Sequence, residues 1–177
     1  MNRACYSGPA IALHWLLAAA IIGNFALGIY MHELPISPQR LVLFNWHKWA
    51  GITILALSAL RLLWRLAHPP PPDVPMPAWQ RRVAHALHRT LYGLFFAVPL
   101  AGWAYSSAAG FPVVVFGVLQ LPDWVPVSDA AADVFKGVHK ACATALGLLV
   151  ITHVAAALKH QVIDRDGLMQ RMGWPGR

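Results

Sequence analysis

The segment GVHKACATALGLLVITHVAAAL, from Gly137 to Leu158, places two histidines in a run that is otherwise apolar enough for lipid. His139 lies near its start, and His153 follows fourteen residues later. In an α-helix, fourteen residues advance about 21 Å along the axis. The same interval brings the side chain back to within about 40° of its first direction. The two rings therefore share one helix face, and each lies near a different side of a bilayer.

The whole chain has the composition of a membrane protein. Of its 177 residues, 58% are hydrophobic and 12% are charged, and the mean hydropathy is +0.51. A soluble domain carries about twice that share of charge. Eight tryptophans fit a protein that anchors itself at two lipid–water interfaces. The two cysteines, Cys5 and Cys142, are too few for a disulfide framework and lie in no CxxC motif.

Four segments approach the length and hydropathy that a membrane-spanning helix needs, which is about 20 apolar residues. They are residues 10–30, 41–66, 84–107 and 134–160. The first contains no charged residue and is longer than the apolar part of a signal peptide, so we expect it to be retained. The predicted fold class is an all-α transmembrane four-helix bundle, built as a single integral membrane domain.

The segments between these spans are rich in proline. Residues 67–83 contain HPPPPDVPMP, which predicts an extended loop. Residues 108–133 are apolar but are interrupted by Pro112, Pro122 and Pro126. We therefore expect the second segment to form a lid-like loop at the membrane interface and not a fifth span.

Topology accounts for the net charge of +7 without nucleic-acid binding. Four of the Lys and Arg residues fall on the side of the bilayer away from the termini: Arg40, Lys48, Lys136 and Lys140. The other ten fall on the side of the termini: Arg3, Arg61, Arg65, Arg81, Arg82, Arg89, Lys159, Arg165, Arg171 and Arg177. The positive-inside rule then predicts that both termini and the 67–83 loop are cytoplasmic and the 108–133 loop is periplasmic.

Four histidines fall at two matched depths in the predicted bundle. His14 and His153 lie near the cytoplasmic side, and His47 and His139 lie near the periplasmic side. Iron binds imidazole readily, so facing pairs at two depths suit two bis-histidine b-type haems stacked across the bilayer. Two axial histidines leave no open coordination position, which favours electron transfer over oxygen binding.

The fourteen-residue interval recurs on the other predicted helices. It joins His14 to Gly28, His47 to Arg61, and His88 to Gly102. We expect the two glycines to let the backbone approach a haem, and the arginine to lie where haem propionates need cations. Three further glycines are expected at close helix contacts: Gly51, Gly93 and Gly147.

Other uses of these histidines stay open. A proton pathway would normally recruit Asp or Glu, and none of the seven acids lies deep in a predicted span. A metal transporter would not need facing pairs. His88 and His160, near the cytoplasmic side, could contact a quinone, a propionate or a proton donor, or could extend to the headgroups. His32 and His68 fall in loops and are expected to be solvated.

Three lysines lie close to the periplasmic histidines. Lys48 and Lys140 directly follow two of them, and Lys136 precedes one by a turn. They gather positive charge, which would speed the arrival of a small anion or pair with propionates and headgroups.

Several stretches together resemble the bacterial cytochrome b561 family. They are IALHWL, NWHKWAGI, ALRLLWRL before the proline-rich loop, AHALHRTLYGLFFAVPLAG, and FKGVH…ITHVAAALKH, in the family's order from about Ile11 to Met172. The resemblance implies a four-helix bundle with two b haems in the bacterial inner membrane. It places the axial ligands at His14, His47, His139 and His153.

The resemblance also implies an activity. The best-understood member of the family is a superoxide oxidase, which releases dioxygen and passes electrons to ubiquinone without needing a protein partner. We therefore expect the three lysines to attract superoxide, and four residues to assist with quinone or propionates: His88, His160, Arg61 and Arg65. Related cytochromes serve hydrogenases and formate dehydrogenases, so the alternative is a haem-bearing anchor that passes electrons between a partner dehydrogenase and the quinone pool.

Overall fold

The structure is a computed structural model that describes residues 5–173. Arg3 and Arg177, which enter the charge count above, lie outside the described residues. The described chain forms these elements in order: α1 (Gly8–Glu33), α2 (Pro38–Ala67), α3 (Ala78–Ala108), β1 (Val114–Val115), β2 (Leu119–Gln120), α4 (Asp129–Lys159), the π-helix η1 (His160–Asp164) and the 3₁₀-helix η2 (Met169–Met172).

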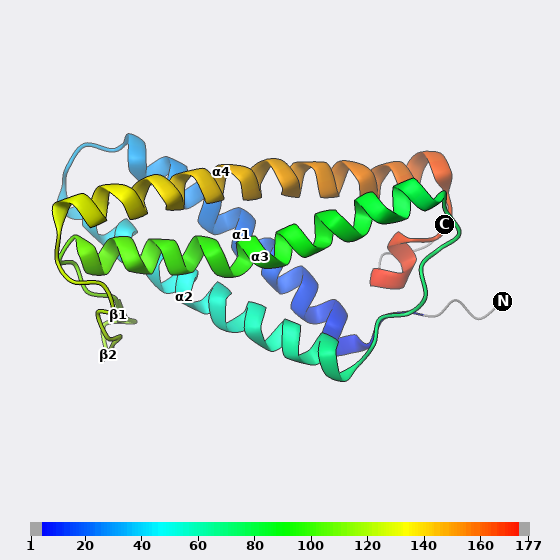
Figure 1. The fold of residues 1–177 in the computed structure, drawn as a ribbon, viewed down its shortest axis with the longest axis horizontal. Coiled ribbons are helices and arrows are strands. Elements are labelled where there is room, and N and C mark those ends of the chain that lie inside the picture. Colours follow the sequence, from blue (N-terminus) through cyan, green and yellow to red (C-terminus); the bar gives the residue numbers. More distant parts are fainter. Residues whose placement is uncertain (1–4, 174–177) are drawn as a thin grey trace.

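The four long helices pack as a bundle, which confirms the predicted all-α class. Figure 1 shows α3 and α4 side by side along the longest axis, with α1 and α2 crossing them obliquely. The first and last described residues lie at one end of the bundle, which we call the terminal end, and the β1–β2 hairpin lies at the other, the hairpin end.

The helix starts follow from capping residues that the sequence supplies. The Ser37 side chain accepts a hydrogen bond from the backbone N–H of Arg40 at 3.3 Å, and a proline follows it at the first helical position. Ser128 caps α4 in the same way, accepting from the N–H of Ala131 at 3.3 Å. The proline-rich segment before α3 has no helical residues, as predicted.

Three of the described helices are long and apolar enough to cross a membrane: α1, α2 and the continuous stretch Asp129–Asp164. Only 11%, 11% and 6% of their most apolar windows are buried inside the protein, so their outer faces are left for lipid. α3 is not among them, because its first half carries arginines and histidines and its last turn contains Ser106 and Ser107. The predicted crossing of residues 84–107 therefore rests on the packing of α3 along α4 and stays a prediction.

Between the end of α3 at Ala108 and the start of α4 at Asp129 the chain forms no helix, but it contains a short antiparallel hairpin that was not predicted. Two residues of α2 hold this segment at the hairpin end. The indole N–H of Trp49 donates to the carbonyl of Val114 at 2.6 Å, and Lys48 Nζ donates to the carbonyl of Phe111 at 3.1 Å.

Close helix contacts occur at one of the three glycines predicted for packing. A Cβ added to Gly147 on α4 would lie 2.9 Å from Phe25 Cζ on α1. At Gly51 the nearest atom, Asn24 Nδ2, would be 3.9 Å away, and at Gly93 nothing lies within 4 Å. The expectation of a close contact at Gly93 was therefore wrong.

We predict that Gly147→Ala destabilises the bundle by about 1–3 kcal/mol, because the new methyl group overlaps the Phe25 ring. Gly93→Ala is the matched control and should be neutral or stabilising, since its methyl group meets open space and alanine favours a helix. Thermal unfolding in detergent, followed by circular dichroism, measures both. Equal melting temperatures for the two variants would contradict the close α1–α4 contact.

Candidate functional site

The functional side chains of α4 follow a seven-residue repeat. His139, Leu146, His153 and His160 are each seven residues apart. Seven residues turn an α-helix to within about 20° of two full turns, so these side chains share one face. The repeat extends the fourteen-residue spacing that the sequence reveals and adds His160 to the same stripe.

The other three helices carry matching stripes, which stack into layers across the bundle. They are His14, Ile21 and Gly28 on α1; His47, Ile54 and Arg61 on α2; and His88, Phe95 and Gly102 on α3. Of the middle members, Ile21, Ile54 and Leu146 belong to the buried apolar core, and Phe95 packs against this core. A layer of hydrophobic side chains thus separates a histidine layer near the hairpin end from one near the terminal end.

The layer near the hairpin end brings His47 and His139 face to face. Their ring centroids are 6.1 Å apart and their planes are inclined by 88°. A Cβ added to Gly28 would lie 3.1 Å from His47 Cε1, and one added to Gly102 would lie 3.0 Å from His139 Cε1. The two glycines therefore make room for the histidine rings, and the approach of their backbone to a haem stays a prediction.

A backbone contact fixes the proton of His139. Its Nδ1 lies 2.9 Å from the carbonyl oxygen of Val98 on α3, and a carbonyl only accepts, so Nδ1 carries the hydrogen. This leaves Nε2 unprotonated and available to a metal.

The layer near the terminal end contains three imidazoles. His14 and His153 have ring centroids 6.2 Å apart, and His88 lies 5.2 Å from His153. His88 Nδ1 donates to the carbonyl of Ala84, one turn back on α3, at 2.7 Å.

The spacing of the rings is a test of whether iron fits between them. Two imidazoles that each place a nitrogen about 2 Å from one metal atom have centroids roughly 6 Å apart. The pairs His47–His139 and His14–His153 meet this distance, at 6.1 and 6.2 Å. The 5.2 Å separation of His88 from His153 is shorter, which favours His14 as the partner of His153. Both predicted pairs thus fit a bis-imidazole iron site.

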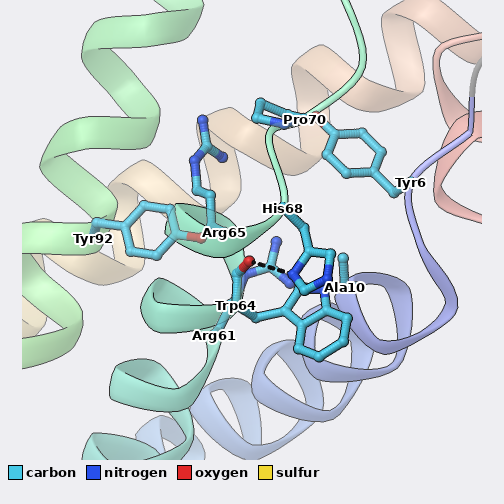
Figure 2. Close-up of a pocket in the computed structure, with 8 residues that line it drawn as sticks. All are labelled: Tyr6, Ala10, Arg61, Trp64, Arg65, His68, Pro70 and Tyr92. Carbon is cyan, nitrogen blue, oxygen red and sulfur yellow. Dashed lines mark hydrogen bonds between the residues drawn. The ribbon is translucent and has the colours of Figure 1, made fainter.

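A cleft opens beside the terminal-end layer, between α1, α2 and α3. Figure 2 shows Tyr92 approaching it from α3 and Tyr6 from the segment before α1. The guanidinium of Arg65 lies 5.7 Å from the centroid of the Tyr92 ring, and Arg61 Nη1 donates to the carbonyl of Ala10 at 2.7 Å.

The His68 ring stacks on Trp64 in the same cleft, with centroids 4.0 Å apart and planes inclined by 9°. The Trp64 indole N–H donates to Ser7 Oγ at 3.0 Å. His68 is exposed just beyond the end of α2, as expected for a loop residue, but its stacking on Trp64 was not predicted. The seven-residue step from Arg61 to His68 is the signal that indicates a shared face.

Three of the four residues predicted to assist with quinone or propionates lie close together at the terminal end. Arg61 and Arg65 line the cleft and lie near His88, which borders His153. His160 lies apart from them, against Gln80 on α3.

The three lysines near the hairpin end also have different surroundings. Lys136 and Lys140 are exposed on α4, one turn apart. Lys48 is instead half-buried and holds the loop through Phe111. The contact of Lys48 with the loop was not predicted, and a shared role of the three lysines in attracting an anion stays a prediction.

A bundle of apolar helices with facing imidazole pairs in its interior is typical of membrane b-type cytochromes. The sequence profile of the prokaryotic cytochrome b561 family matches residues 5–175. The chain therefore belongs to the prokaryotic cytochrome b561 family, whose members are membrane electron-transfer proteins with haem b.

Relatives in two bacteria cover nearly the whole chain. Cytochrome b561 homolog 2 of Escherichia coli is 34% identical, over 94% of this chain and 90% of its own length. Cytochrome b561 homolog 1 of the same organism is 32% identical over 97% of both chains. A protein of Yersinia pestis named as probable superoxide oxidase CybB is 31% identical over 94% of both chains. The family and the apolar helices indicate a bacterial inner-membrane protein.

We predict that Gly102→Ala lowers the haem content of the purified protein, because its methyl group would displace the His139 ring from Val98. Gly23→Ala is the matched control, since nothing lies within 4 Å of its Cβ position. The haem-to-protein ratio from the reduced-minus-oxidised spectrum measures the effect. Full haem loading in Gly102→Ala would show that His139 does not need its present position.

Proposed function

We propose that this chain oxidises superoxide to dioxygen and passes the electrons to ubiquinone through two b haems. The observation that carries the proposal is the presence of two facing imidazole pairs, His47 with His139 and His14 with His153. The choice of superoxide is supported by the Yersinia pestis relative, which is 31% identical and named as a probable superoxide oxidase. The excess of Lys and Arg at the terminal end supports a topology in which both termini are cytoplasmic.

The chain's part is to hold the two haems at fixed depths and to keep water away. A haem b held by each of these histidine pairs would take up and release single electrons, and a pair of imidazoles would leave no position on the iron for oxygen. Val98 orients His139, and Gly28 and Gly102 let α1 and α3 close on the ring pair. The hydrophobic middle layer excludes water between the two depths, which lie about 21 Å apart along α4.

On the periplasmic side, Lys136 and Lys140 supply the positive potential that attracts superoxide. Both are exposed and sit within a turn of His139, so their charge lies near the entry point of the electron. Lys48 assists by holding the neighbouring loop in place through its hydrogen bond to the carbonyl of Phe111. Two superoxide ions lose one electron each and leave as two molecules of dioxygen.

On the cytoplasmic side, the aromatic cleft provides the surroundings that a quinone ring or a haem propionate needs. Arg61 lies in the same layer as His14 and His153, so we assign it to a propionate. Arg65 and the Tyr92 ring border the cleft and suit contact with quinone. Ubiquinone gains two electrons and two protons there and becomes ubiquinol, with His88, which lies near Arg65, as the histidine closest to the cleft.

The second candidate is a haem-bearing anchor subunit for a partner dehydrogenase. The exposed apolar side chains of the hairpin segment favour it, since a partner protein would cover them: Phe111, Phe116, Val118, Leu119 and Trp124. The anchor would bind a partner tightly and would react slowly with superoxide when isolated.

We predict that the purified protein consumes superoxide and forms ubiquinol at one ubiquinol for two superoxide ions. His139→Ala should lose only the periplasmic haem and abolish this reaction. His32 lies in the last turn of α1 and not in a loop as predicted, but it is exposed, so His32→Ala should retain both haems and the activity. Stopped-flow absorbance of the haem bands, with superoxide generated in situ, measures the rate. Superoxide loss no faster in the wild type than in His139→Ala would rule out the oxidase in favour of the anchor.

A further inference from the structure

The β1–β2 hairpin carries an uncovered apolar surface. Three of its exposed side chains are large and apolar, with exposed fractions of 65% for Phe116, 88% for Val118 and 62% for Leu119. No charged residue occurs between positions 109 and 122, and Gln120 supplies the single polar side chain of residues 113–121. Contiguous exposed apolar side chains indicate a surface that another molecule covers.

The turn of the hairpin holds Phe116 against the local preference of the backbone. Phe116 has a φ of 51° and Gly117 a φ of 74°, and the N–H of Val118 donates to the carbonyl of Val115 at 3.0 Å. Two positive φ values between the bonded residues are typical of a type I′ turn, whose first central position favours Asn, Asp or Gly. A bulky residue is uncommon in this conformation, so its presence at the exposed tip points to a use for the side chain.

A contact with α2 fixes the depth of the hairpin in the membrane. The indole N–H of Trp49 donates to the carbonyl of Val114, and the Trp49 ring centroid lies 5.6 Å from that of Phe116. Trp49 follows His47 by two residues, so the tip lies close to the level of the histidine layer near the hairpin end. Two layers about 21 Å apart both fit inside a hydrocarbon core of about 30 Å, which puts each layer a few ångström within its boundary.

The hairpin also projects sideways from the bundle. Figure 1 shows β1 and β2 beside the helices and not beyond the ends of α3 and α4. Val42 and Trp46 precede Trp49 by seven and three residues, so they share its face of α2, and both are exposed. The hairpin therefore continues an apolar flank of α2 that faces lipid, whereas a soluble partner would meet the end of the bundle.

The hairpin backbone is suited to an apolar boundary. Val115 pairs with Leu119 across the two strands, and the N–H of Leu121 donates to the carbonyl of Val113 at 2.9 Å. Backbone polar groups in lipid must be paired within the protein, and a two-stranded hairpin pairs only some of them. This favours a position at the edge of the hydrocarbon, where water among the headgroups reaches the remaining groups.

We propose that the hairpin inserts Phe116 and Val118 into the bilayer leaflet at the hairpin end, where phospholipid covers them at the boundary between headgroups and acyl chains. Trp124 flanks the inserted tip, with its ring centroid 6.2 Å from that of Trp103, as expected for tryptophans at a lipid–water interface. The insertion requires only that the bundle spans the membrane, so it is independent of superoxide and quinone.

Insertion would hold the segment between α3 and α4 in place from two sides. On the protein side, Lys48 Nζ and Ser106 Oγ both donate to the carbonyl of Phe111, where the chain enters the hairpin. On the lipid side, the apolar tip fixes the other end of the same segment. The lid near His139 is thereby attached to α2, to α3 and to the bilayer.

Spin labels on single cysteines test the insertion in haem-loaded protein in nanodiscs of phosphatidylethanolamine and phosphatidylglycerol, after replacement of Cys5 and Cys142 by serine. Val118→Cys is compared with Leu148→Cys, at an exposed site midway along α4, and with Asp133→Cys, at an exposed site in its second turn. Power saturation measures the accessibility of each label to oxygen, which enters lipid, and to a water-soluble nickel chelate. The ratio of oxygen to nickel accessibility should be severalfold higher for Val118→Cys than for Asp133→Cys, approaching that of Leu148→Cys.

A ratio for Val118→Cys equal to that of Asp133→Cys would place the tip in water and overturn the proposal. A label screened from both reagents would show that a second copy of the chain covers the tip, which overturns it as well. Adding Phe116→Asn, a residue that the turn prefers, should keep the haem content but lower the ratio at the Val118→Cys label. An unchanged ratio would remove Phe116 from the anchor.

If the serine replacements reduce haem loading, p-benzoylphenylalanine in place of Val118 tests the same surface in the chain with both cysteines. After irradiation of intact membranes, mass spectrometry should find phospholipid attached to the chain, as it should for the same replacement at Leu148. A crosslink to another protein, or no adduct at position 118, would overturn the proposal. Neither result bears on superoxide oxidation, so the proposed function stands or fails separately.

Discussion

The structure depends on the seven-residue spacing that stacks imidazoles, hydrophobic side chains and imidazoles along the bundle. Histidines are costly inside a bilayer, so each needs a partner that compensates for its burial. The facing pairs His47–His139 and His14–His153 meet at separations that one iron atom can bridge. Gly28 and Gly102 allow this approach only because they lack a Cβ. The spacing thus links helix packing to cofactor binding.

The two ends of the bundle serve different chemistry. At the hairpin end, α2 fixes the loop through Trp49 and Lys48, while two lysines of α4, Lys136 and Lys140, are exposed. At the terminal end, the aromatic cleft lies around α2, whereas the buried His160 lies between α3 and the segment after α4.

Much of this organisation could be predicted from the sequence, because hydropathy and helical periodicity act over short distances. The helix positions and the two histidine pairs follow from run lengths and from the fourteen-residue interval. The contacts of Gln80 with His160 and of Lys48 with Phe111 could not be predicted, since they join residues 80 and 63 positions apart. The contacts of the two glycines with His47 and His139 could not be predicted either, because spacing gives a direction on one helix and not the side chain that meets it from another helix.

The most direct test of the account is the number and ligation of haems in the purified wild-type chain. Pyridine haemochrome analysis against protein concentration gives the stoichiometry, and low-temperature electron paramagnetic resonance gives the ligand field of the oxidised iron. The account predicts two b haems per chain, both low-spin with two imidazoles. A single haem in the fully loaded protein, or a high-spin iron with an open position, would contradict it.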